Sequence, residues 1–256
     1  MMRTQPIQWK ATLIAAVVLL SIAGCGPRKI ADSEKIRLYY EAGIGYINRG
    51  QPDKAIDSLK NAYELDHGYP QVLHALGLAY LQLGVPETAL IWFRKTEELT
   101  PDDSQLLNNL SSTYLALKNY DETIRYATKA LADLNYRTPA AAHYNRGLAR
   151  MHTGDLAGAE ADFMSAIRLE PLYDRPRVEL ARLLIRKGMY DTAINHLTSA
   201  VKINKRNAEA YLLRGQANWE RGLVTQAEND FNHVIRMDSA SPAIMDQAHN
   251  WLDRIQ

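Results

Sequence analysis

The sequence is poor in cysteine, with only Cys25 among 256 residues. Because a single cysteine cannot form an internal disulfide, the fold has to be held together by packing alone. The sequence also lacks an excess of either charge, since 30 basic and 29 acidic residues leave a formal net charge of +1. Nucleic-acid binding usually needs a strongly basic surface, so the composition does not support it. Hydrophobic residues make up 46% of the chain, which argues against disorder.

Sequence motifs of catalysis are absent as well. The chain contains no Gly-x-x-x-x-Gly-Lys phosphate loop, no His-Glu-x-x-His pair and no Gly-x-Ser-x-Gly turn. Its histidines are scattered, and His143 and His152 lie too far apart on one expected helix to form a local metal pair. Acidic residues follow the spacing of solvent-exposed helix faces, which gives no case for paired catalytic carboxylates. We therefore expect no enzymatic activity, metal, cofactor or small-molecule substrate.

The N-terminal segment has the pattern of a secretory signal peptide. Arg3 and Lys10 precede a nearly uninterrupted apolar run over residues 11–22, and small residues follow it. The run is shorter than the roughly 20 residues that a membrane-spanning helix needs. Residues 1–24 are thus predicted to be a leader.

The residues Ile22-Ala23-Gly24-Cys25 resemble the bacterial lipobox. The resemblance implies cleavage before Cys25 and attachment of acyl chains such as palmitate to that cysteine, which would anchor the protein stably. In bacterial lipoproteins an aspartate after the cysteine favours the inner membrane, so Gly26 favours the outer membrane. Residues 26–33 show no apolar period, and we expect residues 25–35 to be the lipidated cysteine and a short tether. The alternative is an ordinary signal peptide with an incidental cysteine.

The rest of the chain repeats itself every 34 residues. Six expected repeats cover residues 36–69, 70–103, 104–137, 140–173, 174–207 and 208–241. The eighth position of each repeat holds a small residue: Gly43, Gly77, Ser111, Gly147, Ala181 and Gly215. The twentieth position is also small: Ala55, Ala89, Thr123, Ala159, Ala193 and Ala227. This period with small residues at these positions is typical of tetratricopeptide repeats.

Each repeat divides into two helical segments, and we expect its eighth and twentieth residues to meet where the helices cross. Glycine marks the break between the segments in five repeats, and Asn119 is expected to replace it in the third. The predicted fold is all-α, a right-handed superhelical solenoid of six helix pairs with a capping helix over residues 242–256. Thr138 and Pro139 interrupt the period and should lengthen one turn, either as a tolerated loop or as a hinge or contact loop.

In proteins with these repeats, the first helix of each pair lines a concave inner wall. The resemblance therefore implies a groove that binds a protein partner, with these candidate residues: Tyr40, His74, Asn108, Asn109, Tyr144, Asn145, Arg175 and Arg182. Asparagine can pair with both peptide groups of an extended segment, and arginine can clamp a carboxylate. Some family members bind chain ends through a carboxylate clamp, but here only Asn145 and Arg175 match it, while Ser112 and Glu179 depart from it.

A narrower resemblance concerns three short stretches. Leu107-Asn108-Asn109-Leu110, the segment 119–123 and Tyr136-Arg137-Thr138-Pro139 are similar to the type IV pilus pilotins, the PilF/PilW and Tgl group. The lipobox and six repeats fit the same group. This resemblance implies a lipoprotein of the outer membrane, with repeats facing the periplasm, that binds secretin subunits and assists their localisation and multimer assembly. The alternatives are a periplasmic adaptor that scaffolds cell-wall or polysaccharide-export enzymes, or a regulator of polysaccharide export.

Overall fold

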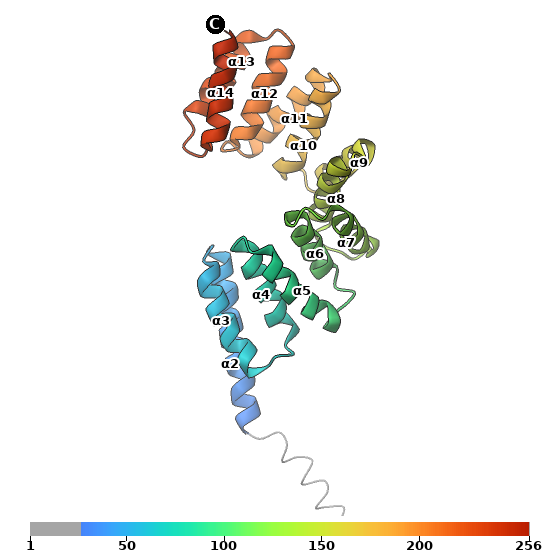
Figure 1. Ribbon diagram of the computed structural model, residues 1–256, viewed down its shortest axis with the longest axis vertical. Helices are drawn as coiled ribbons and strands as arrows, with labels where there is room; N and C mark the ends of the chain where they lie inside the picture. The colour runs from blue at the N-terminus through green and yellow to red at the C-terminus, as the bar shows by residue number, and fades with distance from the viewer. Residues whose placement is uncertain (1–26, 256) are drawn as a thin grey trace, which may run out of the picture. The chain divides into compact units, whose positions relative to one another are not determined.

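The computed structural model describes residues 27–255, and every regular element in this part of the chain is an α-helix (Figure 1). The helices are α2 (Pro27–Asn48), α3 (Pro52–Leu65), α4 (Pro70–Gln82), α5 (Pro86–Leu99), α6 (Ser104–Ala116), α7 (Tyr120–Ala132), α8 (Pro139–Thr153), α9 (Leu156–Leu169), α10 (Asp174–Arg186), α11 (Tyr190–Ile203), α12 (Ala208–Glu220), α13 (Val224–Ile235) and α14 (Pro242–Ile255). They form consecutive antiparallel pairs, which confirms the predicted all-α fold of tetratricopeptide repeats. The predicted leader and Cys25 lie outside the described residues.

None of the helices between residues 27 and 255 combines the length and the apolar character that crossing a membrane requires.

Helix starts follow local sequence signals. Helices α4, α6, α10 and α12 begin at Pro70, Ser104, Asp174 and Ala208, the residues that open repeats in the 34-residue period. Proline occupies the first turn of α3, α4 and α8, where its missing N–H costs nothing. The Asp103 side chain accepts hydrogen bonds from the backbone N–H groups of Gln105 and Leu106 and so caps α6.

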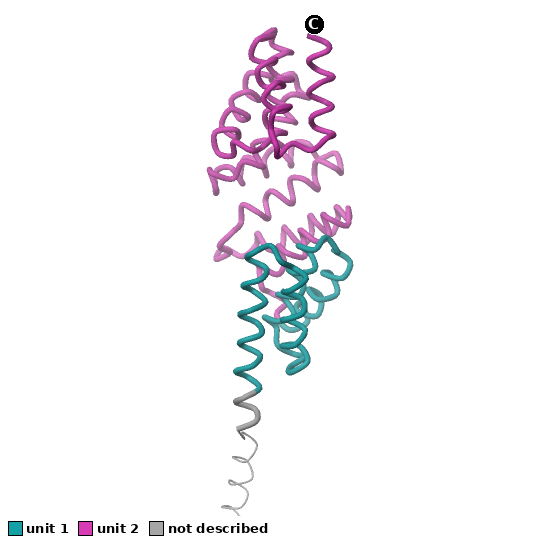
Figure 2. The backbone as a smooth tube through the Cα atoms, turned by 90° about the vertical axis from the view of Figure 1, so that its left-hand side faces the viewer, with its two compact units in different colours: residues 1–99 teal, residues 100–256 magenta. Residues whose placement is uncertain are grey.

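The chain divides into two compact units, residues 1–99 and 100–256, which Figure 2 shows in different colours. The described part of unit 1 contains helices α2 to α5, and its core includes Ile36, Leu59 and Leu76. Unit 2 contains helices α6 to α14, with core clusters around Phe163 and Phe231. Each unit thus has a hydrophobic core of its own.

The small residue at the eighth position of a repeat makes room for a large one at the twenty-fourth. A Cβ atom on Gly77 would lie 2.4 Å from the Phe93 ring, and one on Gly147 would lie 2.7 Å from Phe163. In the third repeat the Ser111 hydroxyl, at the eighth position, donates a hydrogen bond to the carbonyl oxygen of Thr123, at the twentieth, at 3.1 Å, which confirms there that these two positions meet where the helices cross. The long side chain one helical turn after the twentieth position reaches back across the same crossing.

The third repeat makes its internal turn without glycine. Glycines at the other five breaks have φ angles between 68° and 90°, and in the third repeat Lys118 adopts this left-handed conformation with φ 58°. The prediction that Asn119 replaces the glycine is wrong, because the Asn119 side chain instead accepts a hydrogen bond from Glu122 N and caps α7.

Two further departures from the sequence expectations concern helix α2 and the insertion. Helix α2 begins at Pro27, so the described part of the expected tether is helical. The turn at the insertion spans residues 133–138 and is longer than the neighbouring turns 170–173 and 204–207, as predicted. Of the two inserted residues, however, Pro139 belongs to helix α8, and the Thr138 hydroxyl donates a hydrogen bond to Gln105 Oε1 at 3.0 Å.

Helix α14 packs on the last repeat. Its Trp251 ring stacks on Phe231 with a centroid distance of 5.8 Å, and Ala248 is fully buried. This packing covers apolar surface that a terminal repeat would otherwise expose.

Candidate protein-binding site

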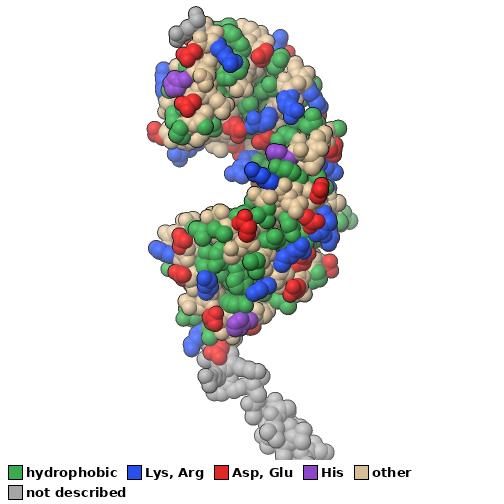
Figure 3. Space-filling view, in the orientation of Figure 1, with side chains coloured by type: hydrophobic (Ala, Val, Ile, Leu, Met, Phe, Trp, Pro, Cys, Tyr) green, Lys and Arg blue, Asp and Glu red, His purple; other side chains and the backbone are tan. Residues whose placement is uncertain are grey.

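The candidate residues of unit 1 lie on the first helices of their pairs. Tyr40 on α2 and His74 on α4 are half-buried, as are their apolar neighbours Ile44 and Leu78. Burial raises the pKa of the Tyr40 hydroxyl, and the neighbouring Tyr69 adds to this shift. Figure 3 shows hydrophobic side chains gathered over unit 1 in this view. A partner that docks here would meet an apolar and aromatic wall.

The three candidate asparagines of unit 2 are buried and engaged within the fold. Asn145 Nδ2 donates a hydrogen bond to Asn108 Oδ1 at 3.2 Å, which joins α8 to α6. Asn109 Oδ1 accepts from Gln105 Nε2 at 3.4 Å. All three side chains are at most 9% exposed. Their amides therefore stabilise contacts between and within helices, and only their remaining hydrogen-bonding atoms could meet a partner.

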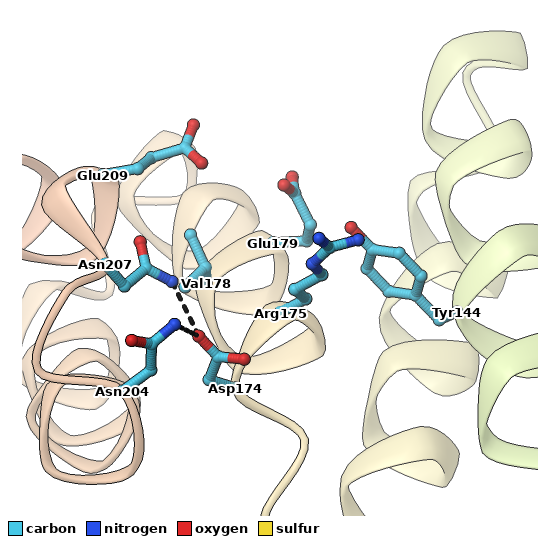
Figure 4. Close-up of a pocket in the computed structure, with 8 residues that line it drawn as sticks. All are labelled: Tyr144, Asp174, Arg175, Val178, Glu179, Asn204, Asn207 and Glu209. Carbon is cyan, nitrogen blue, oxygen red and sulfur yellow. Dashed lines mark hydrogen bonds between the residues drawn. The ribbon is translucent and has the colours of Figure 1, made fainter. Parts of the chain in front are cut away.

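Tyr144 and Arg175 line a cavity of about 400 Å³ in unit 2 (Figure 4). Helices α8, α10 and α12 and the turn between α11 and α12 enclose it. Its lining residues are Tyr144, Asp174, Arg175, Val178, Glu179, Asn204, Asn207 and Glu209. The structure thus brings two of the predicted residues together, and the third, Arg182, is bonded to Glu179 and Glu209 of the same lining.

One wall of the cavity is a network of structural hydrogen bonds. Asp174 Oδ2 accepts from Asn204 Nδ2 at 3.0 Å and from Asn207 Nδ2 at 2.8 Å, as Figure 4 shows. The amide oxygens of these asparagines accept from the backbone N–H groups of Arg206 and Ala210. Because each amide both donates to Asp174 and accepts from the backbone, this wall holds the start of α10 against the turn before α12.

The opposite side of the cavity carries shared ion pairs. Arg182 Nε lies 3.1 Å from Glu179 Oε2, and Arg182 Nη2 pairs with Glu209 Oε1. The Glu179 side chain is only 14% exposed, whereas that of Glu209 is 45% exposed. Burial raises the pKa of Glu179, with Arg182 opposing this shift and Glu209 reinforcing it. One guanidinium therefore balances two carboxylates.

Tyr144 and the Arg175 cation, unpaired among the described residues, form the third part of the lining, and Tyr173 packs against Tyr144 from outside it. The Tyr144 ring lies 5.3 Å from that of Tyr173, and burial raises the pKa of both hydroxyls, for Tyr173 to about 12. Both hydroxyls are therefore neutral hydrogen-bonding groups near pH 7. The Arg175 guanidinium lies beside Tyr144 in Figure 4, and the described residues supply no ion pair for it.

The structure contains buried charged side chains in the fourth and sixth repeats that are not among the residues predicted from the sequence. Asp162 is 2% exposed and accepts hydrogen bonds from Arg146 at 2.7 Å and Arg150 at 2.9 Å. His143 Nδ1 lies 2.9 Å from the same carboxylate. Burial alone would raise the pKa of Asp162, but the hydrogen bonds from His143 and Arg146 and the charges of both arginines outweigh it and lower that pKa.

A related pair in the sixth repeat joins Arg214 to Asp230 at 2.6 Å. In both repeats arginine is the seventh residue and aspartate the twenty-third, and this pattern was visible in the sequence. No other repeat carries it. These pairs join the two helices of one repeat, so they are structural contacts rather than a second binding site.

The described residues contain no group of three histidine, cysteine or acidic side chains arranged to hold a metal ion. The polar chemistry of the unit 2 cavity therefore consists of carboxylates, guanidinium groups, amides and phenols.

Comparison with known families identifies the repeats. The description "TPR repeat" matches residues 45–84 and 181–222, and "Tetratricopeptide repeat" matches residues 108–173 and also 70–103 and 208–241. The chain belongs to the tetratricopeptide-repeat family. Tetratricopeptide repeat protein 16 of Homo sapiens is 26% identical over 132 residues, which are 49% of this chain but only 15% of that protein.

Among solved structures, PilF of Pseudomonas aeruginosa superposes with a TM-score of 0.76 at 21% identity, covering 88% of this chain and 99% of PilF. PilW, described as a widely conserved type IV pilus biogenesis factor, gives 0.74 at 21% identity and covers 85% and 98% of the two chains. A chain from the structure of the APC/C hetero-tetramer Cut9-Hcn1 gives 0.76 at 15% identity and covers 86% of this chain, but only 43% of that chain is covered. These likenesses show the fold.

Proposed function

We propose that this chain is a lipoprotein of the outer membrane that binds the secretin subunit of the type IV pilus and assists its localisation and multimer assembly, as a pilotin does. Its repeats would face the periplasm, anchored through Cys25. The family supplies the coarser statement, a tetratricopeptide-repeat scaffold for protein binding. The finer assignment rests on the correspondence with PilF and PilW over nearly their whole length.

The observation that carries the proposal is that the superpositions with PilF and PilW cover most of this chain and nearly all of the matched chain. Each is matched over nearly its whole length by most of this chain. Other repeat arrays match less well: the chain from the Cut9-Hcn1 structure is covered over only 43% of its length, and a repeat protein of Parabacteroides merdae, although covered over 92%, superposes with a TM-score of 0.64. Correspondence over a whole array therefore favours the same kind of protein, and the lipobox-like residues before Cys25 agree with it.

The chemistry of the surface supports protein binding. Unit 1 offers half-buried apolar and aromatic side chains on its first helices, and unit 2 offers a charged cavity. Protein interfaces combine apolar anchors with polar groups that set specificity. The two units thus supply both kinds of contact.

The secretin role is tested by deletion of the gene and immunoblotting of the secretin. We expect loss of detergent-resistant secretin multimers with the level of subunit largely retained, and recovery when the wild-type chain is supplied. Normal multimers in the deletion strain would contradict the proposal. If cell-wall or polysaccharide-export enzymes were then captured with the chain, the adaptor alternative would replace it.

The anchor is tested separately with Cys25→Ala. We expect this variant to accumulate as an unprocessed or soluble form rather than in the outer-membrane fraction, while its helix content is unchanged. A variant that is still processed and membrane-bound would mean that Cys25 is incidental.

A further inference from the structure

Two carboxylates at the unit 2 cavity each keep one oxygen without a protein partner. Glu179 uses Oε2 and Glu209 uses Oε1 to accept hydrogen bonds from Arg182. No described residue donates a hydrogen bond to Glu179 Oε1 or Glu209 Oε2. Both side chains line the cavity, and in Figure 4 they extend to the same side with Val178 between them. Their free oxygens are therefore available to a ligand in the cavity.

The charges around this space do not balance. The cavity is lined by the three carboxylates of Asp174, Glu179 and Glu209, against which stand the guanidinium groups of Arg175 and Arg182. Arg182 already divides its hydrogen bonds between two glutamates, and Arg175 is directed toward Tyr144 in Figure 4. An additional positive charge between the glutamates would offset a partly desolvated negative one, which is a favourable interaction at low local dielectric.

The shape and lining specify an organic cation rather than a metal ion. The described residues provide no metal-binding group of three acidic, histidine or cysteine side chains. The cavity also has an apolar contact in Val178 and an aromatic one in Tyr144. Lysine and arginine bury their aliphatic stems along apolar surface while the charged head pairs elsewhere, and their heads also interact favourably with aromatic rings.

We propose that this cavity is a subsite for a lysine or arginine side chain of the bound protein partner, with the cationic head between Glu179 and Glu209 and the stem against Val178. The inference rests on the proposed protein-binding function and adds the chemistry of one contact in the partner. It predicts that the partner's docking segment carries a basic residue, and that binding weakens as salt screens the pair.

The experiment titrates three short peptides into the full-length chain in detergent: acetyl-Ala-Arg-Ala-amide, acetyl-Ala-Gln-Ala-amide and acetyl-Ala-Glu-Ala-amide. Methyl NMR of Val178 reports occupancy of the cavity. We expect shifts with the arginine peptide that are absent with the other two. Replacing both glutamates, Glu179→Gln with Glu209→Gln, should weaken that binding about tenfold, as expected for loss of charge-assisted hydrogen bonds.

Two further variants test whether the side chain that binds in the cavity is positively or negatively charged. Arg175→Gln should leave binding of the arginine peptide unchanged or strengthen it, because a repelling charge is removed. Glu228→Gln, an exposed substitution on α13, is the matched control and should change nothing. Should the double variant lose helix content, Glu209→Gln alone is the replacement, since Glu209 is the more exposed carboxylate.

The proposal is overturned if the glutamate peptide binds instead and loses its binding in Arg175→Gln, because the cavity would then take an acidic side chain. It is also overturned if no peptide shifts Val178. The readout is independent of the secretin. If the arginine peptide binds but the deletion strain has normal secretin multimers, only the pilotin role is contradicted. If the peptide does not bind but the deletion strain loses its secretin multimers, only the subsite is contradicted.

Discussion

Units 1 and 2 are built from the same repeat but hold their cores together differently. In the described part of unit 1 the buried polar side chain is Thr96, which donates its hydroxyl to Trp92 O. Unit 2 buries many more: Ser104, Asn108, Asn109, Ser111, Thr113, Thr123, Asn145, Asp162, Asn218 and Asp230. Unit 1 therefore depends on the volume of its apolar side chains, whereas unit 2 depends in addition on charge and hydrogen bonding. Substitutions should therefore affect the stability of the two units through different interactions.

The largest effect is expected for Asp162→Ala in unit 2. Its removal leaves Arg146 and Arg150 half-buried without their main counter-charge, and breaking such a buried ion pair costs about 3–5 kcal/mol. Hydrogen exchange measured by mass spectrometry should show faster exchange in α8 and α9 and no change in α4. Asp57→Ala on the exposed face of α3 is the control and should change stability by less than about 0.5 kcal/mol. Unaltered exchange in α8 would contradict the structural role of the Asp162 cluster.

The next effect concerns packing in unit 1. Gly77→Ala places a Cβ against the Phe93 ring and should cost about 1–3 kcal/mol by overpacking. The fifth repeat shows how this can be relieved, because it pairs Ala181 with Leu197 at the same two positions. Adding Phe93→Leu to Gly77→Ala should therefore recover part of the loss in a thermal or urea unfolding curve. No recovery in the double variant would mean that the pairing of eighth and twenty-fourth positions is not what limits packing.

A smaller effect is expected at the asparagine pair of unit 2. Asn145→Ala removes the hydrogen bond to Asn108 and should cost about 1 kcal/mol, because the partner amide is left buried. Partner affinity is measured on the same variant. The loss of stability by itself explains only a limited fall in affinity. A larger fall would show that Asn145 also contacts the partner.

The smallest expected effect is the change in the stability of unit 2 with pH, because the titrations of two carboxylates change that stability in opposite directions. The pKa of Glu179 is raised in the folded chain, so its stabilisation is complete below its unfolded pKa of about 4.3 and is lost as pH rises through the folded value. The pKa of Asp162 is lowered, so its stabilisation holds above about 3.9 and is lost as pH falls through the folded value.

Acidification from neutral pH should thus first add to the stability of unit 2 and then remove it. Glu179→Gln should abolish the gain, and Asp162→Asn should abolish the loss, in denaturation curves measured at a series of pH values. Unit 1, which contains neither group, is the internal reference. A pH profile of Glu179→Gln that matches the wild type would exclude Glu179 as the titrating group.

A feature could be predicted from the sequence when the residues that determine it are close together in the chain, and could not when they are far apart. Helix starts at Pro70, Ser104 and Asp174 depend on local signals and on the period, so the sequence was sufficient. Pairing of Arg146 with Asp162 joins two helices across 16 residues; the sequence shows both residues at fixed repeat positions, but only the crossing geometry shows that these positions meet. The 34-residue period also runs through residues 99 and 100 without a sign of the division into units.

The candidate site was predicted in part for the same reason. The register of the repeats placed Tyr144, Arg175 and Arg182 on the first helices of their pairs; the structure places the first two in the lining of one cavity and bonds Arg182 to Glu179 and Glu209 of that lining. The same register placed Asn108 and Asn145 there, but it carried no information that the two amides bond to each other and are buried. The roles of Glu179 and Glu209 depend on their sharing of Arg182, which only the packing of α10 against α12 reveals.

Photo-crosslinking in living cells tests most directly whether the first helices of the repeats bind the secretin, with the reactive residue placed on the first or second helix of a repeat. Leu78 on α4 and Tyr144 on α8 probe the proposed binding surfaces. Ile91 on α5 and Met164 on α9, which are 56% and 52% exposed, are the matched positions on second helices. We expect crosslinks to the secretin subunit from Leu78 and Tyr144 and none from Ile91 and Met164. Secretin crosslinks from Ile91 and Met164 alone would contradict it.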